Sequence, residues 1–149
     1  MEDQLAPNVR NPNQQTFAYA AFVWSVVFLV PHVYWAAGGT VGLDGQSMDG
    51  VLAAINYAAI ILSIIAAALA LALVRPWGAL LPHRLLLIGA WGACVLLSLR
   101  GGVGLIQALV VWVGGSDSEL TTLGLIFEPL FLVGGILFGL ASRQYRRDR

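Results

Sequence analysis

Four long apolar segments restrict the possible folds of this chain more than any other feature of its sequence. Each is long enough to cross a bilayer as a helix, which takes about 20 residues. Only short connections separate them, so consecutive helices are expected to run antiparallel. The sequence therefore predicts an all-α integral membrane protein, a four-transmembrane-helix up-down bundle in one domain over residues 16–142. The predicted spans are residues 16–38, 50–74, 85–113 and 120–142.

The composition supports lipid as the solvent of this domain. Hydrophobic residues make up 58% of the 149 residues and charged residues 11%, whereas soluble domains carry about 25% charged residues. The net charge of zero argues against a nucleic-acid partner. Cys94 is the only cysteine, which excludes an internal disulfide and a paired-cysteine redox or zinc site. We expect a multi-pass protein of the cell membrane with membrane lipids as its partners.

Arginines set the predicted orientation. The chain has no lysine, and its arginines outside the spans all lie at one end of the predicted bundle: Arg10, Arg75, Arg84, Arg143, Arg146, Arg147 and Arg149. The two loops at the other end carry acidic residues and no basic one. By the positive-inside rule, the N and C termini are cytoplasmic. Residues 1–15 are then a flexible cytoplasmic tail and residues 143–149 a basic one.

Each predicted span carries one strongly polar residue at a similar depth. At about 1.5 Å per residue, all four lie about 18–24 Å from the cytoplasmic side of a core about 30 Å thick. These residues are His32, Asn56, Arg100 and Glu128. A second polar residue follows or precedes each of them by seven positions, on the same helix face. These second residues are Ser25, Ser63, Gln107 and Thr121. We expect a polar layer inside the bundle, in the outer half of the membrane.

Arg100 and Glu128 are the charged members of this layer, and their spans are neighbours in sequence. An unpaired arginine at the centre of a transmembrane helix costs about 2.5–3.5 kcal/mol on insertion scales. We therefore predict an intramembrane salt bridge between them. It either belongs to an anion or proton site in a water-accessible cavity, or is purely structural and fixes the register of two helices.

Prolines stand next to two residues of the layer. Pro31 precedes His32, and Pro129 follows Glu128. Because proline has no backbone N–H, each leaves a carbonyl unpaired one turn earlier and is expected to bend its helix. His32 then either hydrogen-bonds a backbone carbonyl or relays a proton with Glu128.

Glycines predict close contacts between helices. Gly101 and Gly102 follow Arg100 directly, so either another backbone approaches there or the long third span breaks. Gly135 and Gly139 form a G-x-x-x-G face, which serves packing inside the bundle or in a dimer.

Three stretches resemble a known family. They are "HVYWAAGGTVGLD" at residues 32–44, "LRGGVG" at 99–104 and "FEPLFLVGGILFGLAS" at 127–142. The chain is similar through them to a bacterial family of small four-span integral membrane proteins, the domain of unknown function 3995. The resemblance runs from the first span to the last and implies the four-helix fold. It implies no substrate, reaction or catalytic residue.

Three hypotheses for function remain open. The first is binding or transport of a small anionic or amphipathic ligand at the polar layer, where transport would need a homodimer. The second is an accessory or structural subunit of a larger membrane complex. The third is a small intramembrane enzyme that acts on lipid, with His32 and Glu128 as acid and base. It ranks last, because no nucleophile or metal constellation is present.

The polar layer supplies the candidate ligand-binding residues. Asn56 and Tyr57 either bond between helices or contact the ligand. We predict no catalytic residue, metal ligand or cofactor. The full candidate set is His32, Tyr34, Asn56, Tyr57, Arg100, Gln107 and Glu128.

Overall fold

The computed structural model describes residues 15–43, 45–114 and 122–147, and all regular structure within these ranges is helical. The elements are α1 (Thr16–Ala36), α2 (Gly50–Ala72), the short 3-10 helix η2 (Pro76–Leu80), α3 (His83–Gly114) and α4 (Thr122–Arg147). All four α-helices are long and apolar enough to cross a membrane. The chain is therefore a multi-pass, all-α membrane protein, as the sequence predicts.

The helices differ from the predicted spans mainly at their ends. Helix α1 stops at Ala36, shortly before Gly38, whose φ of 93° is a left-handed conformation that ends helices. Helix α3 begins two residues earlier than expected. Helix α4 continues to Arg147, so residues 143–147 of the predicted basic tail are helical. Of the predicted N-terminal tail, only Gln15 lies within the described residues.

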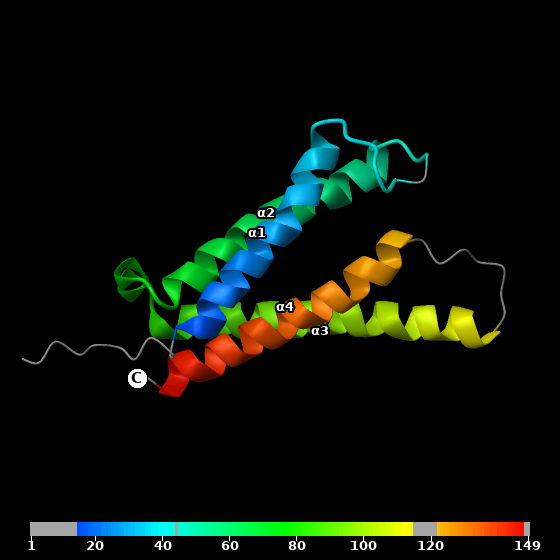
Figure 1. Ribbon diagram of the computed structural model, residues 1–149. Helices are drawn as coiled ribbons and strands as arrows, with labels where there is room; N and C mark the ends of the chain where they lie inside the picture. The colour runs from blue at the N-terminus through cyan, green and yellow to red at the C-terminus, as the bar shows by residue number, and fades with distance from the viewer. Residues whose placement is uncertain (1–14, 44, 115–121, 148–149) are drawn as a thin grey trace, which may run out of the picture.

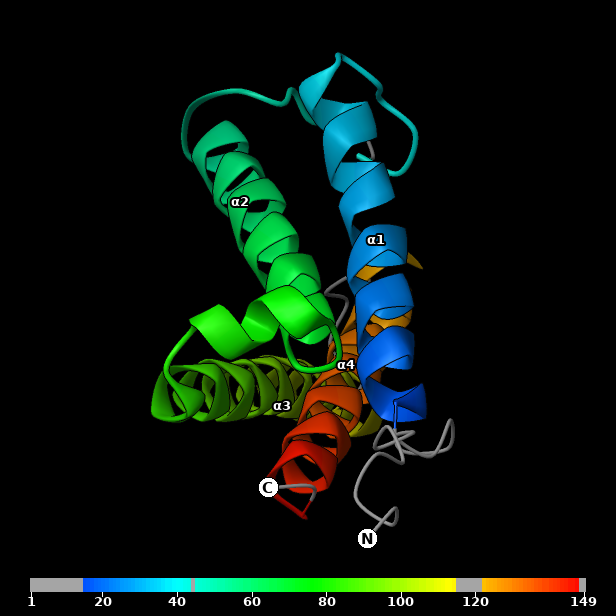
Figure 2. The ribbon, with the colours of Figure 1, turned by 90° about the vertical axis from the view of Figure 1, so that its left-hand side faces the viewer.

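The helices form two antiparallel hairpins, α1 with α2 and α3 with α4 (Figure 1). The hairpins meet near one end of the molecule, where α1 begins, α4 ends and η2 connects α2 to α3. From there they diverge, and α2 and α3 separate with distance from η2 (Figure 1 and Figure 2). The bundle is thus a wedge, closed at the end where the first and last helical residues lie and open toward the other.

The core lies where the hairpins meet, and Trp24 of α1 is central to it. Its ring stacks on Phe28 at 5.3 Å between centroids and meets Phe138 of α4 edge-on at 6.5 Å. Its indole Nε1 donates a hydrogen bond of 2.9 Å to the carbonyl of Leu130. A side chain at Gly134 would overlap the indole, so this glycine lets α1 approach α4.

Glycines also allow α3 and α4 to pack closely. A Cβ on Gly101 would lie 2.8 Å from the carbonyl oxygen of Glu128, and one on Gly139 would lie 3.0 Å from Sγ of Cys94. Gly135 faces α3 as well, so the G-x-x-x-G face is used inside the bundle. Helix α3 runs through Gly101 without a break, because the glycine there serves close packing.

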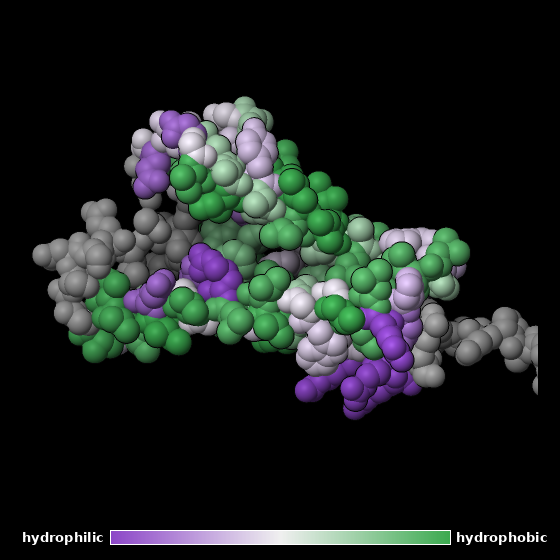
Figure 3. Space-filling view, turned by 180° about the vertical axis from the view of Figure 1, so that it is seen from behind, coloured by the Kyte–Doolittle hydropathy of each residue, from purple (hydrophilic) through white to green (hydrophobic). Residues whose placement is uncertain are grey.

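Hydrophobic side chains cover the sides of the molecule, and most strongly hydrophilic residues gather near the helix ends (Figure 3). All four α-helices expose large apolar side chains, for example Val30, Ile61, Ile106 and Ile136. Monomeric soluble proteins rarely expose continuous apolar surfaces of this kind. This surface is the one that a bilayer solvates.

Candidate functional site

Arg100 and Glu128 form the predicted salt bridge between α3 and α4. Nη1 of Arg100 donates to both carboxylate oxygens of Glu128, at 2.7 Å to Oε1 and 2.6 Å to Oε2. The side chain of Glu128 is 11% exposed, whereas that of Arg100 is 54% exposed. A Cβ on Gly104 would overlap the carboxylate, so a glycine is needed there for Glu128 to reach Arg100.

The rest of the Arg100 guanidinium is left for another partner. Its Cζ lies 4.9 Å from the centroid of the Phe131 ring, a cation–π contact. The N–H groups on Nε and Nη2 make no hydrogen bond with the described residues. The side chain is thus oriented by Glu128 and Phe131, with spare donors on its other edge.

His32 hydrogen-bonds a backbone carbonyl, which is one of its two expected roles. Its Nδ1 lies 2.8 Å from the carbonyl oxygen of Phe28. The acceptor is therefore not the carbonyl of Val27, which Pro31 leaves without its helical donor. Because a carbonyl only accepts, Nδ1 carries a proton and Nε2 holds a lone pair in neutral His32. The ring packs among Phe28, Trp35 and Phe127.

Asn56 links α2 to α1 by a hydrogen bond to the backbone of His32. Its Nδ2 donates a hydrogen bond of 2.9 Å to the carbonyl of His32, and the residue is 4% exposed. A polar contact between its two helices is therefore present in each hairpin, Asn56 to His32 in the first and Arg100 to Glu128 in the second. Both of these contacts, which we call pins, join helices within a hairpin, so they do not hold the two hairpins together.

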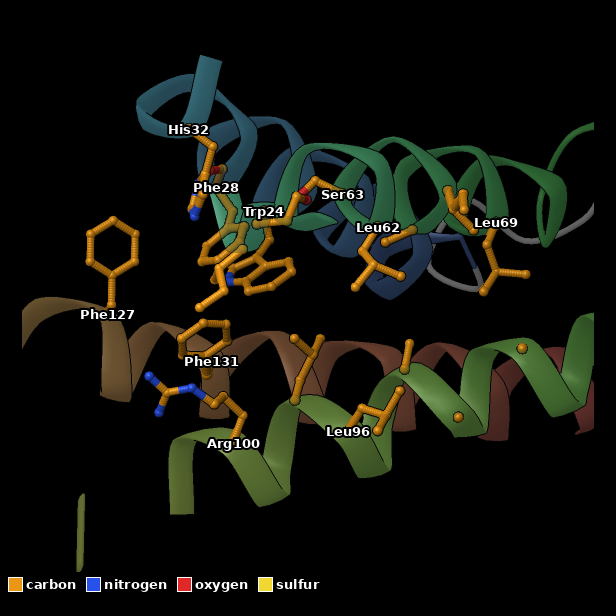
Figure 4. A pocket seen from close by; sticks show the side chains of 18 of the residues that line it. Trp24, Phe28, His32, Leu62, Ser63, Leu69, Leu96, Arg100, Phe127 and Phe131 are labelled. Carbon is orange, nitrogen blue, oxygen red and sulfur yellow. The ribbon is translucent and has the colours of Figure 1, made fainter. Parts of the chain in front are cut away.

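A cavity of about 700 Å³ lies between the hairpins, and residues of all four α-helices line it. Ligand pockets typically have volumes of roughly 300–1,000 Å³. In Figure 4, the ring of Phe28 of α1 lies against that of Phe131 of α4, with 5.1 Å between the centroids, while His32 lies above this pair and Arg100 below it. The cavity is predominantly apolar, and Glu128 is the only carboxylate among its lining residues.

The seven candidate residues occupy different places. His32, Arg100 and Glu128 line the cavity, and Asn56 is buried behind it. Tyr34, Tyr57 and Gln107 do not line it, and all three are exposed. The hydroxyl of Tyr34 accepts a long hydrogen bond, 3.5 Å, from the N–H of Val41 instead.

The second polar residues, each seven positions from a residue of the polar layer, also occupy different places. Ser25 and Ser63 are buried, and each hydroxyl bonds to a carbonyl of its own helix, at 2.8 Å to Ala21 and 2.7 Å to Ala59. Ser63 lines the cavity. Thr121 lies outside the described residues.

The cavity has an aromatic wall, which the polar residues of the sequence do not indicate. It is built by Trp24, Phe28, Trp35, Phe127 and Phe131. Spacings of four and seven residues place each helix's members on one face, so the signal is present in the sequence. The opposite walls, on α2 and α3, carry small residues, among them Ala59, Ala66, Gly92 and Ala93. Small side chains at facing positions leave the space open.

The described residues contain no group of three or more His, Cys, Asp or Glu that could hold a metal ion. The chemistry of the site therefore rests on one fixed cation, one carboxylate and one imidazole in an apolar cavity.

A family model described as "Protein of unknown function (DUF3995)" matches residues 25–138, about three quarters of the chain. The chain belongs to this family. The DUF3995 match begins in α1 and ends in α4, and it contains Arg100, Glu128, His32 and almost all of the cavity lining. No curated protein and no solved structure matches the chain.

Proposed function

We propose that this membrane protein binds an anionic, amphipathic ligand in the cavity between its hairpins, with Arg100 as the contact for the anionic group. The single observation that carries the proposal is the incomplete hydrogen bonding of the Arg100 guanidinium by the described residues. Glu128 engages only Nη1, and the side chain of Arg100, which is among the lining residues of the apolar cavity, stays half-exposed. Donors without partners in an apolar environment are unfavourable, and an anion relieves this with charge-assisted hydrogen bonds.

Glu128 has a defined part in this proposal. Without a ligand, its carboxylate balances the charge of Arg100, which an apolar cavity would otherwise disfavour strongly. A bound anion adds one negative charge, and a proton on Glu128 or on His32 restores neutrality. The lone pair on Nε2 of His32 is available for that proton, because Nδ1 is used by the carbonyl of Phe28.

The purely structural hypothesis fits the geometry less well. A bridge that only sets the register of α3 and α4 needs no cavity at the arginine, and its donors gain by being fully paired. Here the cavity reaches Arg100, Glu128 and His32 together. Accessory binding to a larger complex would instead cover this opening with another protein, so the state of the cavity separates the two hypotheses.

An intramembrane lipid enzyme is the other candidate, favoured by the presence of His32 and Glu128, its acid and base, among the lining residues of one cavity. Its weakness is the lack of an activated nucleophile. Ser63 is the only serine, threonine or cysteine among the lining residues, and its hydroxyl donates to the carbonyl of Ala59. Binding or transport therefore remains the proposal, with the cell membrane as its location.

The proposal is tested by native mass spectrometry of the protein released from lipid nanodiscs. Arg100→Gln removes the charge at the site, and Arg84→Gln removes one at the start of α3, outside the cavity lining. We expect a bound mass on the wild type and on Arg84→Gln that is absent from Arg100→Gln. If the wild type carries no bound mass when it is released from nanodiscs, and still carries none after incubation with dodecyl phosphate, the proposed function is wrong.

A further inference from the structure

We infer that the ligand is a single-chain lipid with an acidic headgroup, which enters sideways from the bilayer between α2 and α3. Its head would lie at Arg100 and its tail along the cavity. This inference rests on the proposed function and adds the class of ligand and its route. It follows from the opening of the cavity, the shape of its walls and the position of its charges.

The opening lies between two helices that are joined by a short connection yet diverge. Helices α2 and α3 approach each other near η2 and separate along the rest of their length (Figure 2). Lining residues at this edge are open to the surroundings: Leu62 of α2 is 61% exposed and Leu96 of α3 is 67% exposed. In a membrane these side chains face lipid, so the direct access to the cavity is from the lipid phase.

The walls suit an extended chain. The α3 wall runs from Gly89 to Arg100, about 16 Å along the helix axis or half the thickness of a bilayer core. Aliphatic and small side chains predominate along it, and the titratable residues of the cavity lie toward its Arg100 end (Figure 4). This polarity matches an amphiphile with one charged end. The volume of about 700 Å³ is that of a site for a drug-sized molecule, smaller than a two-chain phospholipid needs.

The charges around the cavity determine the sign of the headgroup. Facing it are Arg100 from α3, Glu128 from α4 and His32 from α1, and no titratable side chain of α2 lines the cavity. The N–H groups of Arg100 on Nε and Nη2 have no hydrogen-bond partner among the described residues, whereas Glu128 is already engaged with Nη1. A phosphate or carboxylate head therefore gains hydrogen bonds here, while an ammonium head meets a cation.

Gly92 gives a way to fill the tail site without disturbing the protein. It lines the cavity, and a Cβ placed on it meets no atom within 4 Å. Gly102 on the same helix is equally open but does not line the cavity. Gly92→Phe therefore projects a ring into the space for the tail, and Gly102→Phe is the matched control. Ala66→Phe blocks the same space from the α2 wall.

The experiment compares dodecyl phosphate, ethyl phosphate and a two-chain phosphatidate by native mass spectrometry in a non-ionic detergent. Partition of each probe into micelles is the same for all variants, so differences between variants report on the cavity. We expect one dodecyl phosphate per chain and weaker binding of the other two probes. Gly92→Phe and Ala66→Phe should weaken dodecyl phosphate binding about tenfold, equivalent to about 1.4 kcal/mol, and Gly102→Phe should not.

Several results would overturn the inference, and they separate it from the proposed function. Unchanged dodecyl phosphate binding in folded Gly92→Phe and Ala66→Phe would show that the tail is not in the cavity. Equal binding of phosphatidate would refute the single chain. A lipid-free mass of two chains would show that a second copy fills the opening. In the first two cases, continued loss of binding in Arg100→Gln would leave the proposed function standing; retained binding there would refute both.

Discussion

At Arg100, the surroundings orient the guanidinium without satisfying all of it. Glu128 takes one nitrogen, and Phe131 covers one face of the group. Gly104 makes room for the carboxylate that pairs with it. A strongly polar group is thus kept in a fixed position beside an apolar cavity, which is the preparation that recognition of an anion needs.

Removing the carboxylate of Glu128 tests how much its salt bridge with Arg100 contributes to stability. Glu128→Gln leaves the arginine without its counter-charge, so we expect a loss of about 1–3 kcal/mol in the free energy of unfolding. This is less than the roughly 3–5 kcal/mol of a fully buried pair, because Arg100 is half-exposed. Thermal unfolding in detergent measures it. The double variant Arg100→Gln with Glu128→Gln should recover much of the loss, and wild-type stability in both single variants would contradict a stabilising bridge.

Gly104 should be as important as the charges themselves. Gly104→Ala places a methyl group where the Glu128 carboxylate lies, so the carboxylate must leave Arg100 and we expect a loss of about 1–3 kcal/mol. Gly102→Ala is the control, because its Cβ meets open space and alanine favours the helix by up to about 1 kcal/mol. In a Glu128→Ala background, which lacks the side-chain atoms that the new methyl group would overlap, the glycine effect should shrink. An equal effect in both backgrounds would mean that the glycine acts elsewhere.

At the scale of the helices, each hairpin is held internally by a polar contact and the two hairpins are joined by the core around Trp24. The contact of Asn56 with the carbonyl of His32 fixes α1 against α2. The contact of Arg100 with Glu128 fixes α3 against α4. Because α2 and α3 have no such pin among the described residues, the space between them is the place where the structure can admit a ligand.

Asn56→Ala tests the pin of the first hairpin. Interhelical hydrogen bonds in membranes contribute about 0.6–2 kcal/mol, so we expect a loss of stability in that range, measured by thermal unfolding in detergent. Tyr57→Phe is the matched control, because Tyr57 is 55% exposed and its hydroxyl bonds to no described residue. A loss in Tyr57→Phe equal to that in Asn56→Ala would contradict the assignment of the pin to Asn56.

The helices and the salt bridge could be predicted from sequence, and the cavity could not. Long apolar runs fix the helices, and the high energy of an unpaired charge in lipid fixes the pairing of Arg100 with Glu128. The cavity depends on how far two hairpins diverge, which small residues such as Ala59 and Gly92 permit but do not specify. Counting depth along ideal helices also placed Gln107 in the polar layer, but the helix turns its side chain outward.

For the whole molecule, the positions of the termini and the arginines support one orientation. Helix α1 begins and α4 ends at the closed end of the wedge (Figure 1). Arg146 and Arg147 lie in the last turn of α4, and Arg75 and Arg84 flank η2 at the same end. By the positive-inside rule we propose that this end is cytoplasmic, which directs the open end of the cavity to the outer half of the membrane.

A reporter fused after Arg149 tests this orientation. A fluorescent protein that folds only in the cytoplasm should be bright there, and an alkaline phosphatase that needs the outside should be inactive. Replacing Arg143, Arg146 and Arg147 with glutamine should weaken this preference, since the basic residues determine it. An active phosphatase on the wild-type chain would reverse the orientation and place the polar layer in the inner half.

The most direct test of the central claim is to see where a lipid anion touches the protein. Protein in nanodiscs is labelled with a single-chain fatty acid that carries a photoreactive group in its tail, and the labelled residues are mapped by mass spectrometry. We predict labels on half-buried cavity residues such as Ala66 and Leu97, and loss of these labels in Arg100→Gln. Labels spread over lipid-facing residues such as Ile106 and Ile136, unchanged in Arg100→Gln, would contradict a lipid anion site at Arg100.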